Sequence, residues 1–298
     1  MTARAITATA AGTWPLGDHV VNRMGFGSMR ITVDPDPGGA IRVLRRAVEL
    51  GVNHIDTSAF YVSPGGTLRV GTGEPRYAAD LIRRALSSYP DDLLIATKVG
   101  PGVRADGSFY HAKTGAELRT QVEENLSRLG RDHLDLVNLR IMQKPGQDSI
   151  ADRFGALAEM RREGLIRHLG LSNVRVDHLD EAQAIAPIVC VQNNFALDAY
   201  RDDVAVLREC AGRGIAFVPF FALAGRGRES GASTEHGDAV RAVAGAHGAT
   251  PQQVRLAWTL HQGPHVLAIP GTGSLAHLEE NVAAGALRLS DDDLLSLG

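Results

Sequence analysis

Apolar runs of strand length recur along the chain, and segments with the apolar spacing of helices lie between them. Because these runs are apolar throughout rather than alternating, they are typical of parallel strands that helices cover. Strands are expected at residues 23–29, 53–56, 93–98, 134–140, 166–172, 187–192, 215–220 and 266–270. Eight strand–helix units without a break in composition predict an α/β fold, a single (β/α)8 (TIM) barrel domain over residues 1–298.

Apolar spacing and capping residues of helices support the same alternation of strands and helices. Helices are expected at 38–50, 74–87, from residue 114, and at 149–163, 176–184, 201–213, 238–247, 251–261 and 274–284, with loops at 62–73, 99–113 and 221–237. Thr114 with Glu117 forms a capping box, and Thr250 before Pro251 is an N-cap followed by a proline. Two extended pieces around Gly17–Asp18 predict an N-terminal β-hairpin. A doubly wound sheet is the alternative, disfavoured because no Gly-x-Gly-x-x-Gly motif opens a helix after the first strand.

Most of the predicted strands end on a residue that could contact a ligand. These residues are Asp56, Lys98, Arg140, Ser172 with Asn173, Gln192, Phe220 and Pro270. Each has an ordinary structural interpretation when taken alone, such as a turn cap or a solvated lysine. In a barrel, however, the carboxyl ends of the strands meet at one rim, where active sites lie. Their convergence therefore predicts an active site.

Tyr61 follows Asp56 by five residues, and the two suggest proton chemistry. The ordinary pKa of tyrosine is about 10, which is too high for efficient proton transfer near neutrality. We expect the ammonium of Lys98 to lower the pKa of Tyr61, and Asp56 to keep Lys98 charged in a buried ion pair. His54 precedes Asp56 by two residues and is expected to be a core histidine.

The residues that follow the last predicted strand, Pro270 to Ser274, lead into a helix. In barrels this connection and the helix N-terminus commonly bind phosphate. The hydroxyls of Thr272 and Ser274 add donors, and Arg226 and Arg228 in the preceding loop are expected to close over the same anion. An ordinary capped helix beside an ordinary loop is the alternative.

Net charge, apolar runs and cysteine content limit the partners and the location that are expected for the protein. The net charge of −3 gives no reason to expect nucleic acid or an anionic membrane. The sequence has no apolar run of about 18 residues and no signal-peptide pattern, so a cytoplasmic location is expected. Cys190 and Cys210 lack metal-ligand spacing and are expected to be free thiols. Because Gly263–Pro264 separates His261 from His265, no zinc pair and no metal site are expected.

The same residues resemble the aldo-keto reductase superfamily over nearly the whole chain. The motifs that carry the resemblance are Met24–Gly27, Gly51–Ser58 with Tyr61, Ala96–Lys98, Asp135–Leu139, Gly170–Asn173, Val191–Asn193 and Ile269–Thr272 with Glu280–Asn281. The resemblance implies a barrel without a Rossmann motif that binds NADPH, less often NADH.

The resemblance also implies roles for particular residues. Tyr61 would be the general acid, and Lys98 and Asp56 would tune it. Ser172, Asn173 and Gln192 would hold the nicotinamide, with Phe220 or Phe221 near its ring. The further residues implied at the cofactor are Gly27, Ser28, Met29, Gly225, Arg226, Pro270, Gly271, Thr272, Ser274, His277, Glu280 and Asn281, of which Gly271, Thr272, Ser274, Glu280 and Asn281 would lie at the adenosine and 2′-phosphate end.

Two positions depart from the family pattern. Arg140 stands where a histidine is usual; it can donate hydrogen bonds to a carbonyl oxygen but cannot shuttle a proton. His277 stands where many members carry an arginine for the 2′-phosphate. Residues 137–142, 188–193, 217–221 and 269–278 are similar to bacterial pyridoxal reductases, in which the same arginine occurs.

The expected activity is NADPH-dependent reduction of a small-molecule aldehyde or ketone, with pyridoxal as a candidate and Arg140 as a fourth catalytic residue that polarises the carbonyl. A tailoring ketone reductase or a sugar dehydrogenase is an alternative, because the loops at 62–73 and 225–228 do not match the pyridoxal reductases. An NADPH-binding sensor with weak chemistry is an alternative of another class, which Arg140 motivates. The sequence is silent on oligomeric state.

Overall fold

A computed structural model describes residues 6–66, 68, 70–104, 107–141, 149–198, 204–223 and 236–298. Its main sheet is parallel, with the strand order β13-β12-β11-β10-β7-β4-β3. The strands are β3 (Phe26–Gly27), β4 (His54–Asp56), β7 (Leu94–Val99), β10 (Leu134–Arg140), β11 (Ile166–Ser172), β12 (Cys190–Gln192) and β13 (Ala216–Phe217).

An eighth segment closes this sheet into a barrel. Val266 bridges Phe217, the last residue of β13, and Ala268 bridges Met24, two residues before β3, both in parallel. The strand expected at 266–270 is thus present as two single bridges, one to each edge of the sheet. The predicted (β/α)8 barrel is confirmed.

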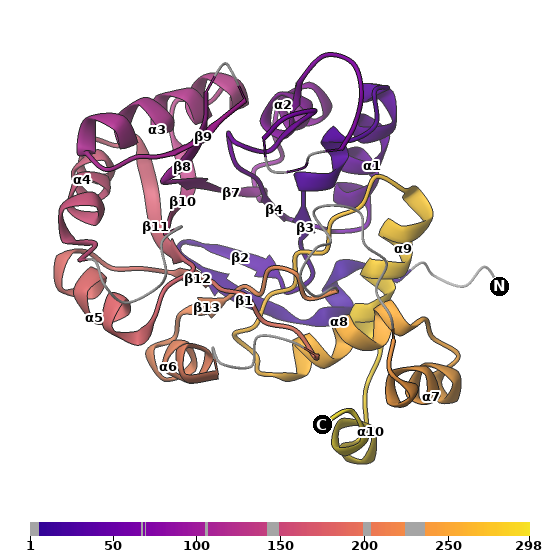
Figure 1. Ribbon diagram of the computed structural model, residues 1–298. Helices are drawn as coiled ribbons and strands as arrows, with labels where there is room; N and C mark the ends of the chain where they lie inside the picture. The colour runs from indigo at the N-terminus through magenta and orange to yellow at the C-terminus, as the bar shows by residue number, and fades with distance from the viewer. Residues whose placement is uncertain are drawn as a thin grey trace.

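Helices surround the barrel on its outside, as Figure 1 shows in a view into the ring. They are α1 (Pro37–Glu49), α2 (Ala78–Leu86), α3 (Gly115–Leu129), α4 (Ala151–Arg162), α5 (Val176–Ile185), α6 (Val204–Arg213), α7 (Asp238–His247), α8 (Pro251–His261), α9 (Leu275–Ala283) and α10 (Asp291–Leu297). The capping boxes predicted at Thr114 and Thr250 are both present. Among the described residues, no helix has the length and apolar character that crossing a bilayer requires.

The predicted N-terminal hairpin is formed by β1 (Thr13–Leu16) and β2 (His19–Asn22). Its buried Leu16 and Val21 belong to the same apolar cluster as Leu94, the first residue of β7, and Leu136, the third residue of β10. The side chain of Asp18 at its turn lies 2.6 Å from Nε2 of His168 on β11. The hairpin therefore covers the barrel at the amino ends of the strands, opposite the rim where the predicted site residues stand.

Two of the expected loops contain short antiparallel pairs, and one helix begins later than predicted. β5 (Val62–Ser63) pairs with β6 (Arg76–Tyr77), so α2 starts at Ala78 rather than at residue 74. The side chain of Arg76 bonds to the carbonyl oxygens of Thr32 and Val33, which holds this segment in extended form. β8 (Pro101–Val103) pairs with β9 (Phe109–His111) in the expected loop after β7.

Candidate active site

A buried ion pair lies at the carboxyl ends of β4 and β7. Nζ of Lys98 is 2.7 Å from both carboxylate oxygens of Asp56, and it also donates to the carbonyl oxygen of Thr57 at 3.1 Å. The predicted pair is thus present. Burial lowers the pKa of Lys98, but Asp56 and Tyr61 together more than offset this and leave the pKa raised, so Lys98 stays charged.

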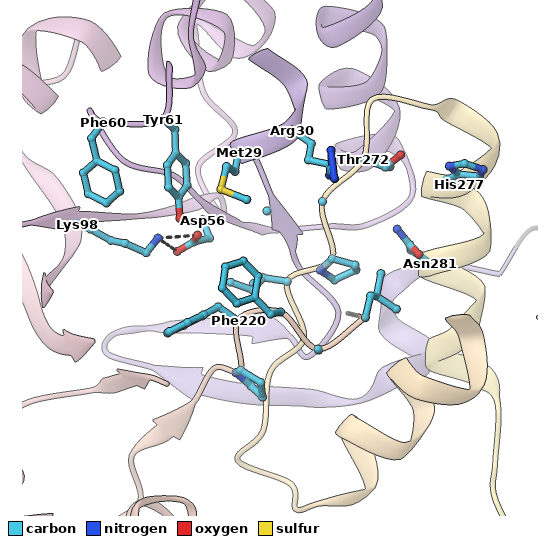
Figure 2. A pocket seen from close by; sticks show the side chains of 18 of the residues that line it. Met29, Arg30, Asp56, Phe60, Tyr61, Lys98, Phe220, Thr272, His277 and Asn281 are labelled. Atoms are coloured by element: carbon cyan, nitrogen blue, oxygen red, sulfur yellow. Dashed lines mark hydrogen bonds and ion pairs between the residues drawn. The ribbon is translucent and has the colours of Figure 1, made fainter. Parts of the chain in front are cut away.

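Tyr61 stands over this pair. Nζ of Lys98 lies 4.9 Å from the centre of its ring, and its hydroxyl points toward Lys98 and Asp56 in Figure 2. Burial raises the pKa of Tyr61, and the charges of Lys98 and Arg140 oppose the rise without cancelling it. The ammonium of Lys98 lowers the pKa of Tyr61 as expected, but desolvation of the phenolate is the larger effect, so the net shift is upward. Tyr61 therefore keeps its proton near neutral pH.

Arg140 at the end of β10 faces the same space from the other side. One of its terminal nitrogens donates to Oγ of Ser172 at 3.0 Å, and its guanidinium carbon lies 4.6 Å from the centre of the Phe220 ring. Its charge acts on Tyr61. The four residues implied to be catalytic thus share one rim of the barrel.

The residues implied to hold the nicotinamide have other contacts here. Ser172 accepts from Arg140, and Asn173 donates to the carbonyl oxygen of Ile141 at 2.7 Å. Nε2 of Gln192 donates to Oδ1 of Asp56, also at 2.7 Å. The other side-chain atom of Gln192, Oε1, is buried without a hydrogen-bond partner among the described residues.

A cavity of about 720 Å³ extends from these residues to α9. The predicted site residues that line it are Gly27, Met29, Asp56, Tyr61, Lys98, Arg140, Phe220, Phe221, Pro270, Gly271, Thr272, His277, Glu280 and Asn281. Ser28, Ser172, Asn173, Gln192 and Ser274 are not in its wall, although Ser274 caps α9. Gly225, Arg226 and Arg228 lie outside the described residues.

One end of this cavity suits an extended dinucleotide. His277 and Asn281 project from α9, far from Lys98 in Figure 2, and Thr272 precedes the N-terminus of the same helix. Positive charge and backbone N–H groups at a helix N-terminus favour phosphate. The buried Oε1 of Gln192 and Oγ of Ser28 lack hydrogen-bond partners among the described residues. These residues fit the cofactor that the sequence implies.

Several wall residues were missed by sequence reasoning. They are Arg30, Phe60, Phe109, Leu223 and Gln252. Phe109 lies on β9 and is 40% exposed, although aromatic side chains are usually buried. Phe60 packs edge to face on Tyr61, with 5.2 Å between the ring centres.

Comparisons with known proteins agree with one another. The profile of the Aldo/keto reductase family matches residues 23–297. The chain is 43% identical to pyridoxine 4-dehydrogenase of Escherichia coli (strain K12), over 97% of this chain and 98% of that protein. It is 28% identical to the Schizosaccharomyces pombe aldo-keto reductase yakc, named for NADP(+), over 94% and 88% of the two chains. The solved structure of thermostable aldo-keto reductase Tm1743 with the inhibitor epalrestat has a TM-score of 0.75 at 29% identity, covering 96% of this chain and 98% of that one.

Proposed function

Since the chain belongs to the aldo/keto reductase family, we propose that it uses NADPH to reduce the aldehyde of pyridoxal to the alcohol. The family and the relatives make it an oxidoreductase that acts on carbonyl groups. The pyridoxine 4-dehydrogenase, 43% identical, supports the substrate, and the NADP(+)-named relative supports the cofactor.

Tyr61 is the proton donor in this proposal. Its raised pKa keeps the hydroxyl protonated near neutrality, and its hydroxyl faces the cavity rim beside Lys98. As the carbonyl oxygen gains negative charge, Tyr61 transfers a proton to it while Lys98 stabilises the phenolate that is left. NADPH, when bound, supplies the hydride and both electrons for the carbonyl carbon. Asp56 holds the ammonium of Lys98 in place through two contacts of 2.7 Å.

The substrate in this proposal is inferred mainly from Arg140. Its guanidinium is planar, is always charged and can donate two parallel hydrogen bonds, which a histidine cannot do. Ser172 and the Phe220 ring fix its plane beside Tyr61. An aldehyde with an ionised hydroxyl on the next ring carbon presents two oxygens side by side to such a fork. Pyridoxal is such a compound, and the aromatic wall residues Phe60, Phe109 and Phe221 suit its flat ring.

The test compares NADPH oxidation with pyridoxal, 2-hydroxybenzaldehyde, benzaldehyde, aldose sugars and polycyclic ketones. We expect pyridoxal to be reduced fastest and 2-hydroxybenzaldehyde to be favoured over benzaldehyde. Arg140→Leu should reduce that preference by about tenfold or more, the value of a charged hydrogen bond. Faster reduction of sugars or polycyclic ketones would replace pyridoxal by those substrates, and bound NADPH without turnover of any compound would indicate a sensor.

A further inference from the structure

An arginine fastens the loop between β5 and β6 to the segment that follows β3. The guanidinium of Arg76 on β6 donates to the carbonyl oxygens of Thr32 and Val33, at 3.0 and 3.2 Å. It also donates to the carbonyl oxygens of Thr72 and Glu74 in its own loop, at 3.0 and 2.7 Å. The planar guanidinium has five N–H donors in a fixed arrangement, so one side chain can join two stretches of backbone.

The same two segments also meet through buried groups. Oγ1 of Thr32 lies 3.0 Å from Oγ of Ser63, and neither residue has exposed surface. Gly71 of the loop packs against the same place, because a Cβ there would lie 3.1 Å from the carbonyl oxygen of Val33 and 3.5 Å from Cβ of Ser63. A buried hydroxyl without a partner would destabilise the fold, so the contact between Thr32 and Ser63 favours one placement of the loop.

The loop forms part of the cavity wall next to Tyr61. Gly66 lines the cavity and is buried, and its φ of +65° favours glycine. A Cβ at Gly66 would lie 2.3 Å from Cγ1 of Val62 and 3.1 Å from the carbonyl oxygen of Phe60, so the loop folds back against both neighbours of Tyr61. Met29, from the segment after β3, projects into the same cavity in Figure 2. The bonds between the two segments therefore fix the wall where the carbonyl group of a substrate must lie.

The volume of the cavity leaves little room for the substrate. It measures about 720 Å³. A pocket for a single drug-sized ligand already measures about 300–1,000 Å³, and this cavity must hold a dinucleotide as well. A wall that cannot move back then limits how large the substrate can be.

We propose that the loop between β5 and β6 is, at Gly66, a fixed wall that restricts the substrate to carbonyl compounds with one small ring, and that Arg76 is the positioning residue that holds it. Arg76 is not itself in the described wall of the cavity and acts through the backbone that it bonds. The inference deepens the proposed function and rests on it for carbonyl compounds as substrates, but not for pyridoxal.

The experiment measures binding to the protein loaded with NADP⁺, which cannot donate a hydride. The two probes are 2-hydroxybenzaldehyde and 2-hydroxy-1-naphthaldehyde, which present the same pair of oxygens and differ by one fused ring. Titration calorimetry gives the ratio of their Kd values. We expect the wild type to favour the single ring by about tenfold or more. Arg76→Met, which removes the donors and keeps an unbranched side chain, should reduce this ratio several-fold.

Further variants separate the bonds of Arg76 from its charge. Arg76→Lys keeps the charge without the planar fork, so it should lower the ratio as Arg76→Met does. Thr32→Val removes the hydroxyl contact with Ser63 and should change the ratio in the same direction, so it serves as a second variant if Arg76→Met does not fold. Arg45→Met is the matched control and should keep the wild-type ratio, because Arg45 donates to the carbonyl oxygen of Ala85 near the other end of α2.

Two results would overturn the inference. In one, the wild type binds both aldehydes equally well, or binds neither, so the wall does not select by size. In the other, Arg76→Met lowers the melting temperature but leaves the ratio of Kd values unchanged, as the loss of a purely structural arginine would. Because no hydride is transferred, failure to reduce pyridoxal, which would refute the proposed function, would not change either result.

Discussion

The guanidinium carbon of Arg140 lies 4.6 Å from the centre of the Phe220 ring. At this distance a cation over an aromatic face is attracted by about 0.5–2 kcal/mol. Ser172 accepts from the same guanidinium, so two neighbours fix its plane. The orientation of Arg140, and with it the proposed choice of substrate, depends on a ring from another strand end.

Phe220→Leu should therefore reduce the preference for 2-hydroxybenzaldehyde over benzaldehyde several-fold, because the guanidinium loses one of the groups that orient it. The ratio of kcat/KM for the two aldehydes is the measurement. Phe109→Leu is the control, since Phe109 also lines the cavity, whereas the cation–π contact of Arg140 is to Phe220. Equal losses of preference in both variants would contradict the prediction.

Tyr61→Phe should lower kcat by about 10²–10⁴-fold, which is the usual contribution of a positioned general acid. NADPH affinity, measured by fluorescence titration, should change little because the ring is retained. A variant that keeps most of its turnover would remove Tyr61 from the mechanism.

Lys98→Met leaves the buried Asp56 carboxylate with Gln192 as its remaining side-chain donor among the described residues. We expect the free energy of unfolding to fall by about 3–5 kcal/mol, because one charge of a buried pair is left uncompensated. The double variant Asp56→Asn/Lys98→Met should be more stable than Lys98→Met alone. Denaturant unfolding of the two variants and the wild type checks this order, and a double variant that is less stable than Lys98→Met would refute it.

Stability should depend on pH through His54. Burial lowers its pKa from about 6.5 to about 4, so the unfolded chain binds a proton at a higher pH than the folded one. The stabilising contribution is complete above about pH 6.5, decreases as the pH falls, and is lost below about pH 4, a change of up to about 3 kcal/mol. Unfolding at several pH values should show a flatter profile for His54→Leu. His111→Leu, the same substitution at an exposed position on β9, is the control for the loss of a histidine.

A glycine is required at position 25 because the ring of His54 lies against it. A Cβ at Gly25 would lie 2.1 Å from Nε2 of His54, a buried ring that cannot move aside easily. Gly25→Ala should cost about 1–3 kcal/mol by overpacking. His54→Ala makes room, so the double variant should be more stable than the sum of the single losses indicates. Thermal or denaturant unfolding of all four proteins tests for this coupling.

Much of this site followed from the sequence because parallel strands end at one rim. Asp56, Lys98 and Arg140 each close an apolar run, and that pattern alone placed them together. The bond from Gln192 to Asp56 was not predictable in the same way. β12 and β4 are separated in the sheet by β11, β10 and β7, so the contact depends on the curvature of the barrel, which local patterns do not encode.

Other differences arose where tertiary contacts override local preference. Residues 74–77 were expected to begin a helix, yet Arg76 bonds to carbonyl oxygens of the segment after β3, and Tyr77 pairs with Val62. The sign of the net Tyr61 pKa shift was also missed. Sequence shows that Lys98 is near, but the degree of burial, which decides the balance here, is a property of the packed structure.

The hairpin β1–β2 also bears on the order of events at Tyr61. Because the hairpin covers the amino ends of the strands, cofactor and substrate reach Tyr61 from the carboxyl ends, where one cavity extends from Arg140 to Asn281. Two molecules that enter through the same opening must bind one after the other. The molecule that lies deeper must bind first and leave last. The closed amino end of the barrel thus fixes the order of binding and release at the open carboxyl end.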